Sequence, residues 1–212
     1  MTRLVVRHLG TVPYDETWQR MKAFTRDRDA ATYDELWLLQ HPAVYTLGQA
    51  GKPEHIIAPG DIPIVQSDRG GQVTYHGPGQ LVGYLMIDIK RLGVGVRAVV
   101  TGIERAIIDL LGGIGIRGMA RKDAPGVYVA GQKVAALGLR VRRGCTYHGL
   151  SVNVDMDLSP FIGINPCGYE GLEVVDLKTL GRSLTVVEVA EQLAPIIGVE
   201  FAYDALIHEV KK

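Results

Sequence analysis

Cys167 lies in the segment NPCGYEG, where a proline precedes the cysteine and a glycine follows it. This combination is typical of a tight turn, which can expose a sulfur atom and direct backbone N–H groups toward it. A free cysteine titrates near about 8.5, so a nucleophilic cysteine needs a nearby group that favours its thiolate. The turn predicts a reactive thiol at Cys167, and the rest of the chain must supply its partner.

Lys133 is one candidate partner, because it begins the strand-like segment KVAALGLRV. Alternate side chains of a regular strand share a face, so Lys133 is predicted to lie with Ala135, Leu137, Leu139 and Val141. A lysine on such an apolar face loses hydration of its ammonium, which favours a negatively charged partner. The alternative is that Lys133 lies at the strand end and extends its amine to water. The pattern leaves both interpretations open.

His76 and His148 are two further candidate partners, since histidine is a common base beside a catalytic cysteine. In the segment CTYHGLSVNV, strict alternation places His148 on the apolar face with Leu150 and Val152, and Cys145 on the other face. A β-bulge would change these faces. Cys145 is therefore predicted to be a packed strand residue without a chemical role.

The segment RGGQVTYHGPGQ, residues 69–80, contains four glycines. Glycine allows the backbone to approach a ligand closely, because no Cβ intervenes. We expect one turn at Gly70 and Gly71, another at residues 77–79, and a short strand between them. The segment lacks the lysine followed by serine or threonine of a phosphate-binding loop, and it lacks the dinucleotide spacing G-x-G-x-x-G. A plain hairpin is the alternative to a ligand-binding loop.

The elements that must position these residues can be read from periodicity. Residues 13–30, 97–112 and 185–197 show the period of amphipathic helices, and Thr185 with Glu188 forms a capping box. In the second helix, Glu104 lies outside the predicted apolar stripe. Nine segments have the alternation of strands: 3–9, 34–40, 43–48, 62–66, 72–76, 81–89, 126–130, 133–141 and 146–154. Strands do not alternate regularly with helices, which favours a mixed β-sheet with flanking helices in an α/β or α+β domain.

Composition restricts the classes of function. The chain has 212 residues, of which 47% are hydrophobic and 22% charged, and this suits a single domain over residues 1–212. Basic and acidic residues both number 23, so no net charge favours nucleic acid or a membrane surface. No secretory signal or spanning segment is recognisable, and 2 cysteines predict no disulfide framework. We expect a cytoplasmic protein without a metal, because the 6 histidines are scattered.

Three segments together resemble the octanoyltransferases of lipoate biosynthesis, also called the lipoyl(octanoyl) transferase or lipoate-protein ligase B family. They are RGGQVTYHGPGQ, GQKVAALGLRVRRGCTYHGLSVN and INPCGYEG, and HPAVYTLGQ supports the match. The resemblance extends from about Leu4 to Leu193. It implies the α/β fold of biotin and lipoate ligases. It also implies transfer of an octanoyl group from acyl carrier protein to a lysine of a lipoyl domain.

By this resemblance Cys167 would carry the octanoyl group as a thioester, and Lys133 would favour the thiolate. No cofactor is implied, because the phosphopantetheine of acyl carrier protein holds the acyl donor. The acceptors would be lipoyl domains of 2-oxoacid dehydrogenase complexes and the glycine cleavage H protein. The implied substrate-binding residues are Arg69, Gly70, Gly71, Gln72, Val73, Thr74, Tyr75, His76, Ala136, Leu137, Gly138, Gly149, Leu150 and Ser151.

The protein partners implied by the resemblance are usually acidic, so a basic surface could dock them. One candidate patch combines Arg140, Arg142 and Arg143 with Arg121 and Lys122. An ordinary solvated strand edge is the alternative.

Three other functions stay open from the sequence. An ATP-dependent lipoate or biotin ligase of the same fold would activate a free acid as an adenylate and need no cysteine nucleophile. A non-catalytic module would bind acyl carrier protein without transferring the acyl group. A thiol protease is the third alternative, which a lysine partner suits poorly.

Overall fold

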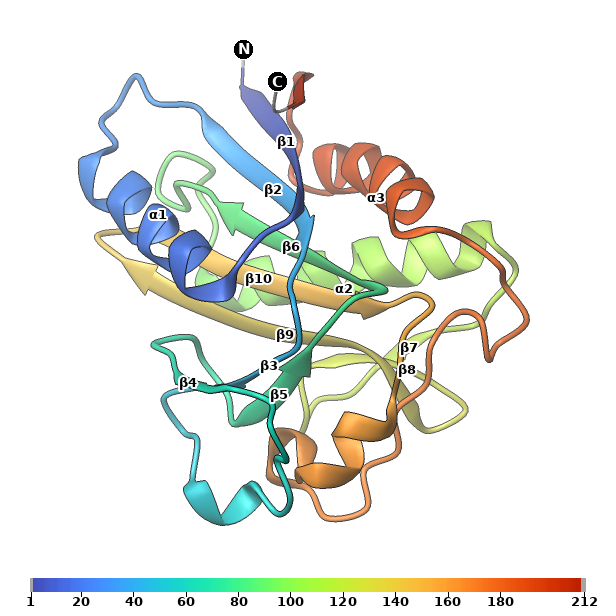
Figure 1. Cartoon of the computed structure of the whole chain (residues 1–212). Helices are drawn as coiled ribbons and strands as arrows, with labels where there is room; N and C mark the ends of the chain where they lie inside the picture. The colour runs from blue at the N-terminus through green and yellow to red at the C-terminus, as the bar shows by residue number, and fades with distance from the viewer. Residues whose placement is uncertain (1, 211–212) are drawn as a thin grey trace.

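The computed structural model describes residues 2–210 and contains two β-sheets and three α-helices (Figure 1). The large sheet has eight strands in the order β11-β1-β2-β6-β10-β9-β8-β7. Its strands are β1 (Arg3–Thr11), β2 (Asp34–Gln40), β6 (Gln80–Met86), β7 (Met119–Ala120), β8 (Gly126–Val129), β9 (Gln132–Arg142), β10 (Cys145–Asn153) and β11 (Ala205–Val210). β1 runs parallel to β2 and β11, and the other neighbouring pairs are antiparallel. The predicted mixed sheet is confirmed.

The helices cover the two faces of the large sheet unequally. Helix α1 (Tyr14–Asp27) packs on one face with Trp37, Val82 and Tyr84. The other face holds the main core, in which side chains of helices α2 (Val96–Gly113) and α3 (Val186–Glu200) pack against alternate residues of the same strands. Because both faces are covered, the central strands are buried throughout, as β6 is.

All three predicted helices are present, with boundaries within a few residues of the expected ones. Thr185 accepts a hydrogen bond from the Glu188 backbone N–H at the start of α3, and the Glu188 carboxylate accepts one from the Thr185 N–H. The predicted capping box is confirmed. The prediction for Glu104 is wrong: this side chain is buried and accepts a hydrogen bond from the backbone N–H of Gly126, 3.0 Å away.

A small sheet packs beside the large one, in the order β4-β3-β5. Its strands are β3 (Val44–Leu47), β4 (Ile64–Gln66) and β5 (Val73–His76). It has its own apolar cluster, which includes Tyr45, Tyr75 and Phe161. The turn at residues 77–79 carries the chain from β5 in this sheet to β6 in the large sheet, so the hairpin alternative is wrong.

Two further strands, β7 and β11, are not predicted from the sequence. The segment 201–210, which is ambiguous by period, closes α3 and then forms β11 beside β1 (Figure 1). The two-residue strand β7 is not predicted from the sequence, because two residues are too few to show a period. No helix within residues 2–210 combines the length and hydrophobicity needed to cross a bilayer.

Candidate active site

The Lys133 Nζ and Cys167 Sγ atoms lie 2.9 Å apart, although 34 residues separate them in sequence. Lys133 lies at the start of β9, and Cys167 lies in the 3-10 turn Pro166–Gly168. Just after this turn, the chain runs parallel to the start of β9: the Lys133 N–H donates to the Glu173 carbonyl, and the Val175 N–H donates to the Lys133 carbonyl. This backbone pairing brings the cysteine turn to the lysine.

The backbone of Cys167 is left-handed, with φ 59° and ψ 13°, and Gly168 follows with φ 79°. Non-glycine residues adopt this conformation rarely, and such strain is concentrated at functional sites. The turn is closed by a hydrogen bond from the Gly168 N–H to the Asn165 carbonyl. As predicted, Cys167 is partly exposed, whereas Cys145 is buried, and burial raises the pKa of the Cys145 thiol.

Lys133 is buried, with 3% of its surface exposed, so the alternative in which its amine extends to water is wrong. Its Nζ also donates to the Pro125 carbonyl at 3.1 Å and lies 5.5 Å from the centre of the Tyr128 ring. The predicted strand face is wrong as well. Lys133 pairs with Tyr128 but Ala135 pairs with Val127, so one extra residue interrupts the ladder. This irregularity separates Lys133 from the alternation that directs Leu137, Leu139 and Val141 into the main core.

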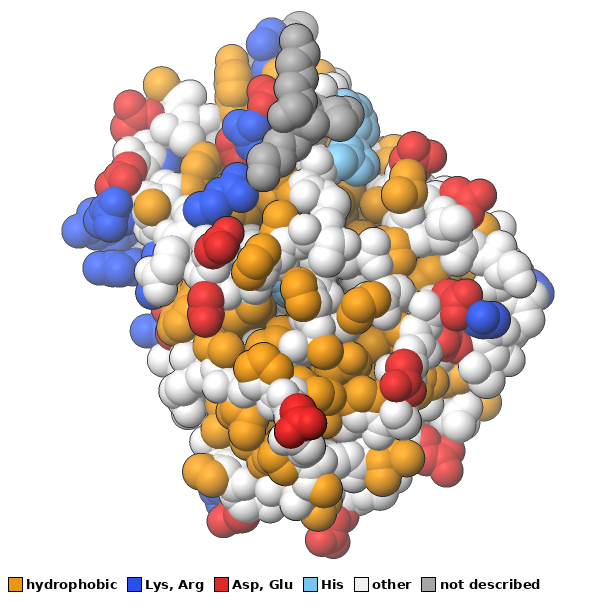
Figure 2. Space-filling model, viewed as in Figure 1, with side chains coloured by type: hydrophobic (Ala, Val, Ile, Leu, Met, Phe, Trp, Pro, Cys, Tyr) orange, Lys and Arg blue, Asp and Glu red, His pale blue; other side chains and the backbone are white. Residues whose placement is uncertain are grey.

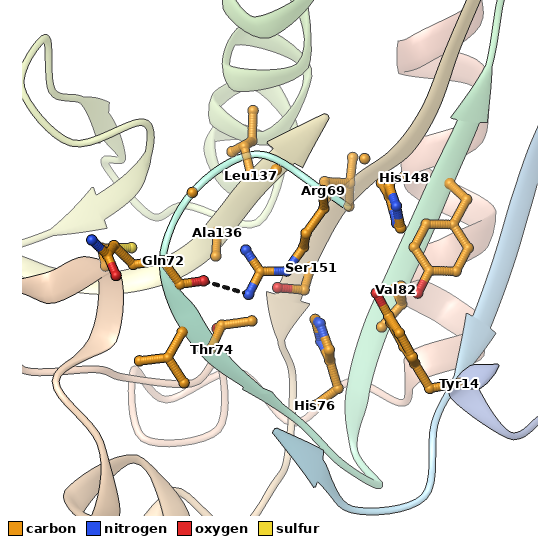
Figure 3. A pocket seen from close by; sticks show the side chains of 17 residues that line it. Tyr14, Arg69, Gln72, Thr74, His76, Val82, Ala136, Leu137, His148 and Ser151 are labelled. Atoms are coloured by element: carbon orange, nitrogen blue, oxygen red, sulfur yellow. Dashed lines mark hydrogen bonds between the residues drawn. The ribbon is translucent and has the colours of Figure 1, made fainter. Parts of the chain in front are cut away.

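A pocket of about 490 Å³, counting its open mouth, adjoins the thiol. Its walls come from α1, the loop before β5, β5 itself, β6, β9 and β10 (Figure 3). The residues that line it are Tyr14, Arg69, Gly71, Gln72, Val73, Thr74, His76, Val82, Tyr84, Ala136, Leu137, Gly138, His148, Gly149, Leu150, Ser151 and Cys167. The small apolar residues of β9 and β10 thus form a groove that leads away from the cysteine.

The predicted substrate-binding residues line this pocket, with two exceptions. Gly70 does not line it, because its N–H donates to the Leu139 carbonyl of β9 at 3.0 Å. Tyr75 packs instead into the apolar cluster of the small sheet, beside Tyr45 and Phe161. Tyr75 differs from Thr74 and His76 because neighbouring side chains of β5 point to opposite faces.

Arg69 lines the pocket, but its guanidinium donates hydrogen bonds to neighbouring groups of the chain. Its guanidinium donates to the hydroxyl and carbonyl oxygens of Thr46 and to the carbonyl of Gly70. It also donates to the carbonyl of Gln72 (Figure 3). Burial lowers the pKa of Arg69. The side chain therefore holds the glycine-rich loop in its conformation. Arginine suits this position because its guanidinium carries several donors in fixed directions.

His148 lies on the opposite face from the predicted one. Its φ of 60° breaks the alternation of β10, so its ring stacks on that of Tyr147, with the centroids 5.0 Å apart. His148 Nε2 and Trp18 Nε1 both lie within hydrogen-bonding distance of Asp68 Oδ1, at 2.9 and 2.7 Å, and the Tyr147 hydroxyl donates to Oδ2. Partial burial disfavours the carboxylate, but these hydrogen bonds outweigh it and hold the pKa of Asp68 well below its ordinary value.

Four lining residues are not among the predicted contacts: Tyr14, Val82, Tyr84 and His148. The local sequence gives Tyr14 only as part of an apolar helix stripe. Val82 and Tyr84 fall on consecutive same-face positions of β6, which a strand pattern alone cannot assign to a ligand pocket. Only the packing of α1 and β6 around the loop brings these residues to the site.

The basic residues proposed as one docking patch lie in two places. Arg142 is at the end of β9, paired with Cys145, whereas Arg121 follows β7, whose partner strand pairs with the beginning of β9. The length of β9 separates them by roughly 20 Å or more. Arg121 is further engaged with Asp123 at 2.7 Å. The five residues do not form a continuous patch.

An apolar groove opens on the other side of the cysteine turn. It is lined by Ile57, Leu158, Phe161, Ile162, Ile164, Pro166, Leu172 and Val174, together with polar residues. In the view of Figure 2, hydrophobic side chains gather over these segments below the large sheet. The lining of this groove includes Asn165 and Pro166, the two residues before Cys167, so the groove lies beside the cysteine turn.

The fold and the site together define a class of protein. A model of the lipoyl protein ligase A/B catalytic domain matches residues 13–197. An octanoyltransferase from Ectopseudomonas mendocina is 57% identical over 204 residues, which cover 96% of this chain and 100% of that protein. One from Shewanella amazonensis is 57% identical over 205 residues, covering 97% of this chain and 95% of the relative. The chain belongs to the lipoyl protein ligase A/B catalytic domain family and, within it, to the octanoyltransferases.

Solved structures with low sequence identity share the fold. A bipartite lipoate protein ligase from Thermoplasma acidophilum superimposes with a TM-score of 0.75 at 13% identity, covering 100% of this chain and 88% of that chain. A biotin protein ligase from Aquifex aeolicus gives a TM-score of 0.55 at 12% identity, covering 95% of this chain and 70% of that chain. The implied biotin and lipoate ligase fold is confirmed.

Proposed function

We propose that the chain transfers an octanoyl group from the phosphopantetheine of acyl carrier protein to a lysine of a lipoyl domain, through a thioester on Cys167. The observation that carries the proposal is the 2.9 Å contact between Lys133 Nζ and Cys167 Sγ at the mouth of the pocket. It is supported by octanoyltransferases that are 57% identical to this chain over the matched residues.

In the first half-reaction, the ammonium of Lys133 stabilises the thiolate of Cys167, which attacks the carbonyl carbon of the octanoyl thioester. The bond from that carbon to the pantetheine sulfur breaks, and Lys133 donates its proton to the departing thiolate. The developing oxyanion requires donors, and the Cys167 N–H is our candidate within the turn, because the Gly168 N–H is already bonded to the Asn165 carbonyl. Such a donor typically contributes about 3 kcal/mol.

In the second half-reaction, the amine of the lipoyl-domain lysine attacks the Cys167 thioester. Lys133, neutral after the first step, accepts the proton that the amine loses, and the cysteine departs as a thiolate. An amide replaces a thioester, which is downhill, so the reaction needs no ATP. No separate cofactor is needed either, because acyl carrier protein brings the activated acyl group.

The pocket holds the alkyl chain while the carbonyl is at the thiol. Its apolar lining includes Val73, Val82, Ala136 and Leu150. Burial is worth about 0.8 kcal/mol for each CH₂ group, so an eight-carbon chain draws several kcal/mol from the pocket. Gly149 in the pocket wall is required for the close approach of β10 to β6, because a Cβ on it would lie 2.2 Å from the Gly83 carbonyl oxygen.

The decisive experiment is intact-mass analysis after incubation with octanoyl-acyl carrier protein. We expect a hydroxylamine-labile octanoyl adduct on Cys167, which disappears when a lipoyl domain is added and octanoylated. Lys133→Ala should slow formation of the adduct at least a hundredfold, because the thiolate loses its counter-charge and the departing thiol loses its acid.

Cys145→Ala is the matched control, since it removes the other cysteine and leaves the site intact. An adduct that vanishes with Cys145→Ala and persists in Cys167→Ala would contradict the proposal. Pyrophosphate release from octanoate and ATP in the absence of acyl carrier protein would support a ligase instead.

A further inference from the structure

His148 Nδ1 is a buried polar atom with no hydrogen-bond partner among residues 2–210. The side chain is 1% exposed and lines the pocket, on the side away from Gln72 and Thr74 (Figure 3). A buried polar atom without a partner destabilises the folded protein. A ligand group that forms a hydrogen bond with this nitrogen would remove that destabilisation.

The protonation of the ring follows from its other nitrogen. Nε2 lies 2.9 Å from Asp68 Oδ1, and a carboxylate can only accept, so Nε2 carries the hydrogen. Burial lowers the pKa of His148, which keeps the ring neutral despite its contact with Asp68. In the neutral ring Nδ1 has a lone pair and no hydrogen. It is an acceptor, and its complement is a donor.

Two neighbouring hydroxyl groups of this part of the pocket are already engaged. The Tyr14 hydroxyl bonds to Ser67 Oγ at 2.7 Å, and the Tyr84 hydroxyl bonds to His41 Nε2 at 2.8 Å. Neither hydroxyl pairs with His148 Nδ1, which stays a buried acceptor without a partner among the described residues.

The position of His148 relative to the thiol matches the far end of the acyl chain. Ala136 and Ser151 pair with each other and line, with Cys167 and Lys133, the small cavity at the dyad. His148 lies three residues before Ser151 on β10, which is about 10 Å along the strand. This distance is comparable with an extended eight-carbon chain, so an acyl group on Cys167 directs its last carbons toward His148.

We propose that this end of the pocket is a subsite for a hydrogen-bond donor, so that the site takes acyl chains bearing a hydroxyl group at the far end. The inference rests on the proposed function. A terminal hydroxyl donates to His148 Nδ1, whereas a methyl group of the same size leaves that nitrogen unpaired. The transfer chemistry is unchanged: the thiolate of Cys167 displaces the pantetheine thiol from either thioester.

Two isosteric pairs of pantetheine thioesters test the subsite. Octanoyl is compared with 7-hydroxyheptanoyl, and nonanoyl with 8-hydroxyoctanoyl, so chain length is matched within each pair. The rate of Cys167 loading is followed by intact mass. In the wild-type protein we expect the hydroxylated chain of at least one pair to load as fast as its partner. A wholly apolar pocket would slow both hydroxylated chains about tenfold or more, because each hydroxyl would be buried without a partner.

Two variants of His148 assign the effect to its Nδ1 atom. His148→Phe removes the acceptor and should lower the ratio of hydroxylated to methyl-ended loading at least tenfold. His148→Asn places an amide oxygen near the Nδ1 position and tolerates the left-handed backbone, so we expect its ratio to stay within about threefold of wild type. The ratio within one protein cancels any general loss of activity. Tyr147→Phe, which also removes a contact to Asp68, should leave the ratio unchanged.

The inference is overturned if the wild-type protein loads both hydroxylated chains more than tenfold slower than their partners, a comparison that needs no variant to fold. Equal ratios in the wild type and in folded His148→Phe overturn it too. Failure of the wild type to load octanoyl on Cys167 would instead refute the proposed function itself.

Discussion

At the scale of single residues, the site depends on how closely the groups around Lys133 pack. Gly126 has φ 146°, and a Cβ there would lie 2.5 Å from Lys133 Cε and 2.7 Å from the Ala135 carbonyl oxygen. The absence of a side chain at Gly126 therefore leaves the space in which the lysine reaches Cys167. The same residue donates its N–H to Glu104, so the glycine is held in place on its other side.

Gly126→Ala is expected to displace the Lys133 amine and slow thioester formation on Cys167 at least tenfold. The new methyl group would contact both the Ala135 carbonyl and the Lys133 side chain. The carbonyl is held in the backbone of β9, so the more flexible lysine side chain must move away. The measurement is the rate of adduct formation, with circular dichroism to confirm that the variant folds. Gly112→Ala on α2 is the control, because nothing lies within 4 Å of its Cβ. Equal rates for Gly126→Ala and Gly112→Ala would exclude this role.

At the scale of elements, one buried hydrogen bond links α2 to β8, the strand next to the edge of the large sheet. Glu104 on α2 accepts from the Gly126 N–H at the start of β8, and both groups are buried. β8 in turn supports the start of β9, where Tyr128 pairs with Lys133. Glu104 can lie in the buried face of α2 because its carboxylate accepts a hydrogen bond from the Gly126 N–H.

Glu104→Ala should lower the free energy of unfolding by about 1–3 kcal/mol, because it leaves the Gly126 N–H buried and unpaired. Glu104→Gln keeps an acceptor oxygen and should lose less. The measurement is urea unfolding followed by circular dichroism. The matched control is Asp109→Ala, an exposed position of the same helix, where we expect a change within about 0.5 kcal/mol. A Glu104→Ala protein as stable as the control would show that the contact contributes nothing.

At the scale of the whole molecule, histidines are buried where the two sheets and α1 meet. His41 Nδ1 lies 2.6 Å from the Val12 carbonyl and Nε2 lies 2.8 Å from the Tyr84 hydroxyl, an arrangement that suits a neutral ring. Burial lowers the pKa of His41 to about 4 and that of His76 to about 3. These rings join parts of the chain that are distant in sequence.

This burial makes stability depend on pH. Below about pH 6.5 the unfolded chain binds protons at these histidines, whereas the folded chain does not until about pH 4 or below. The free energy of unfolding should therefore fall as pH decreases from 6.5 to 4, by up to about 1.4 kcal/mol per pH unit for each ring. Urea unfolding at pH 7, 6 and 5 measures the slope.

His41→Gln should be less stable at pH 7 but should show a shallower slope, because one of the linked protonations is removed. His208→Gln changes an exposed histidine and serves as the control. A slope that is the same in the wild type and in His41→Gln would contradict the assignment.

Much of the secondary structure could be predicted, because it depends on local patterns. The apolar stripe of α2, which includes Val99, Ile103 and Ile107, is buried as its period predicts. The alternation failed at Lys133 and His148, where an extra residue in one ladder and a left-handed backbone interrupt the strands. Such irregularities depend on neighbouring strands and leave no clear signal in one sequence.

The sequence by itself determined the helices, most strands, the cysteine turn and, through its resemblance to a family, the pairing of Cys167 with Lys133. These follow from short-range periodicity and from motifs. Only the tertiary structure added the pocket residues that were not among the predicted contacts, such as Tyr14 from α1, Tyr84 from β6 and His148 from β10. The physical reason is that burial and hydrogen-bond satisfaction depend on contacts between segments far apart in the chain, which no local pattern encodes.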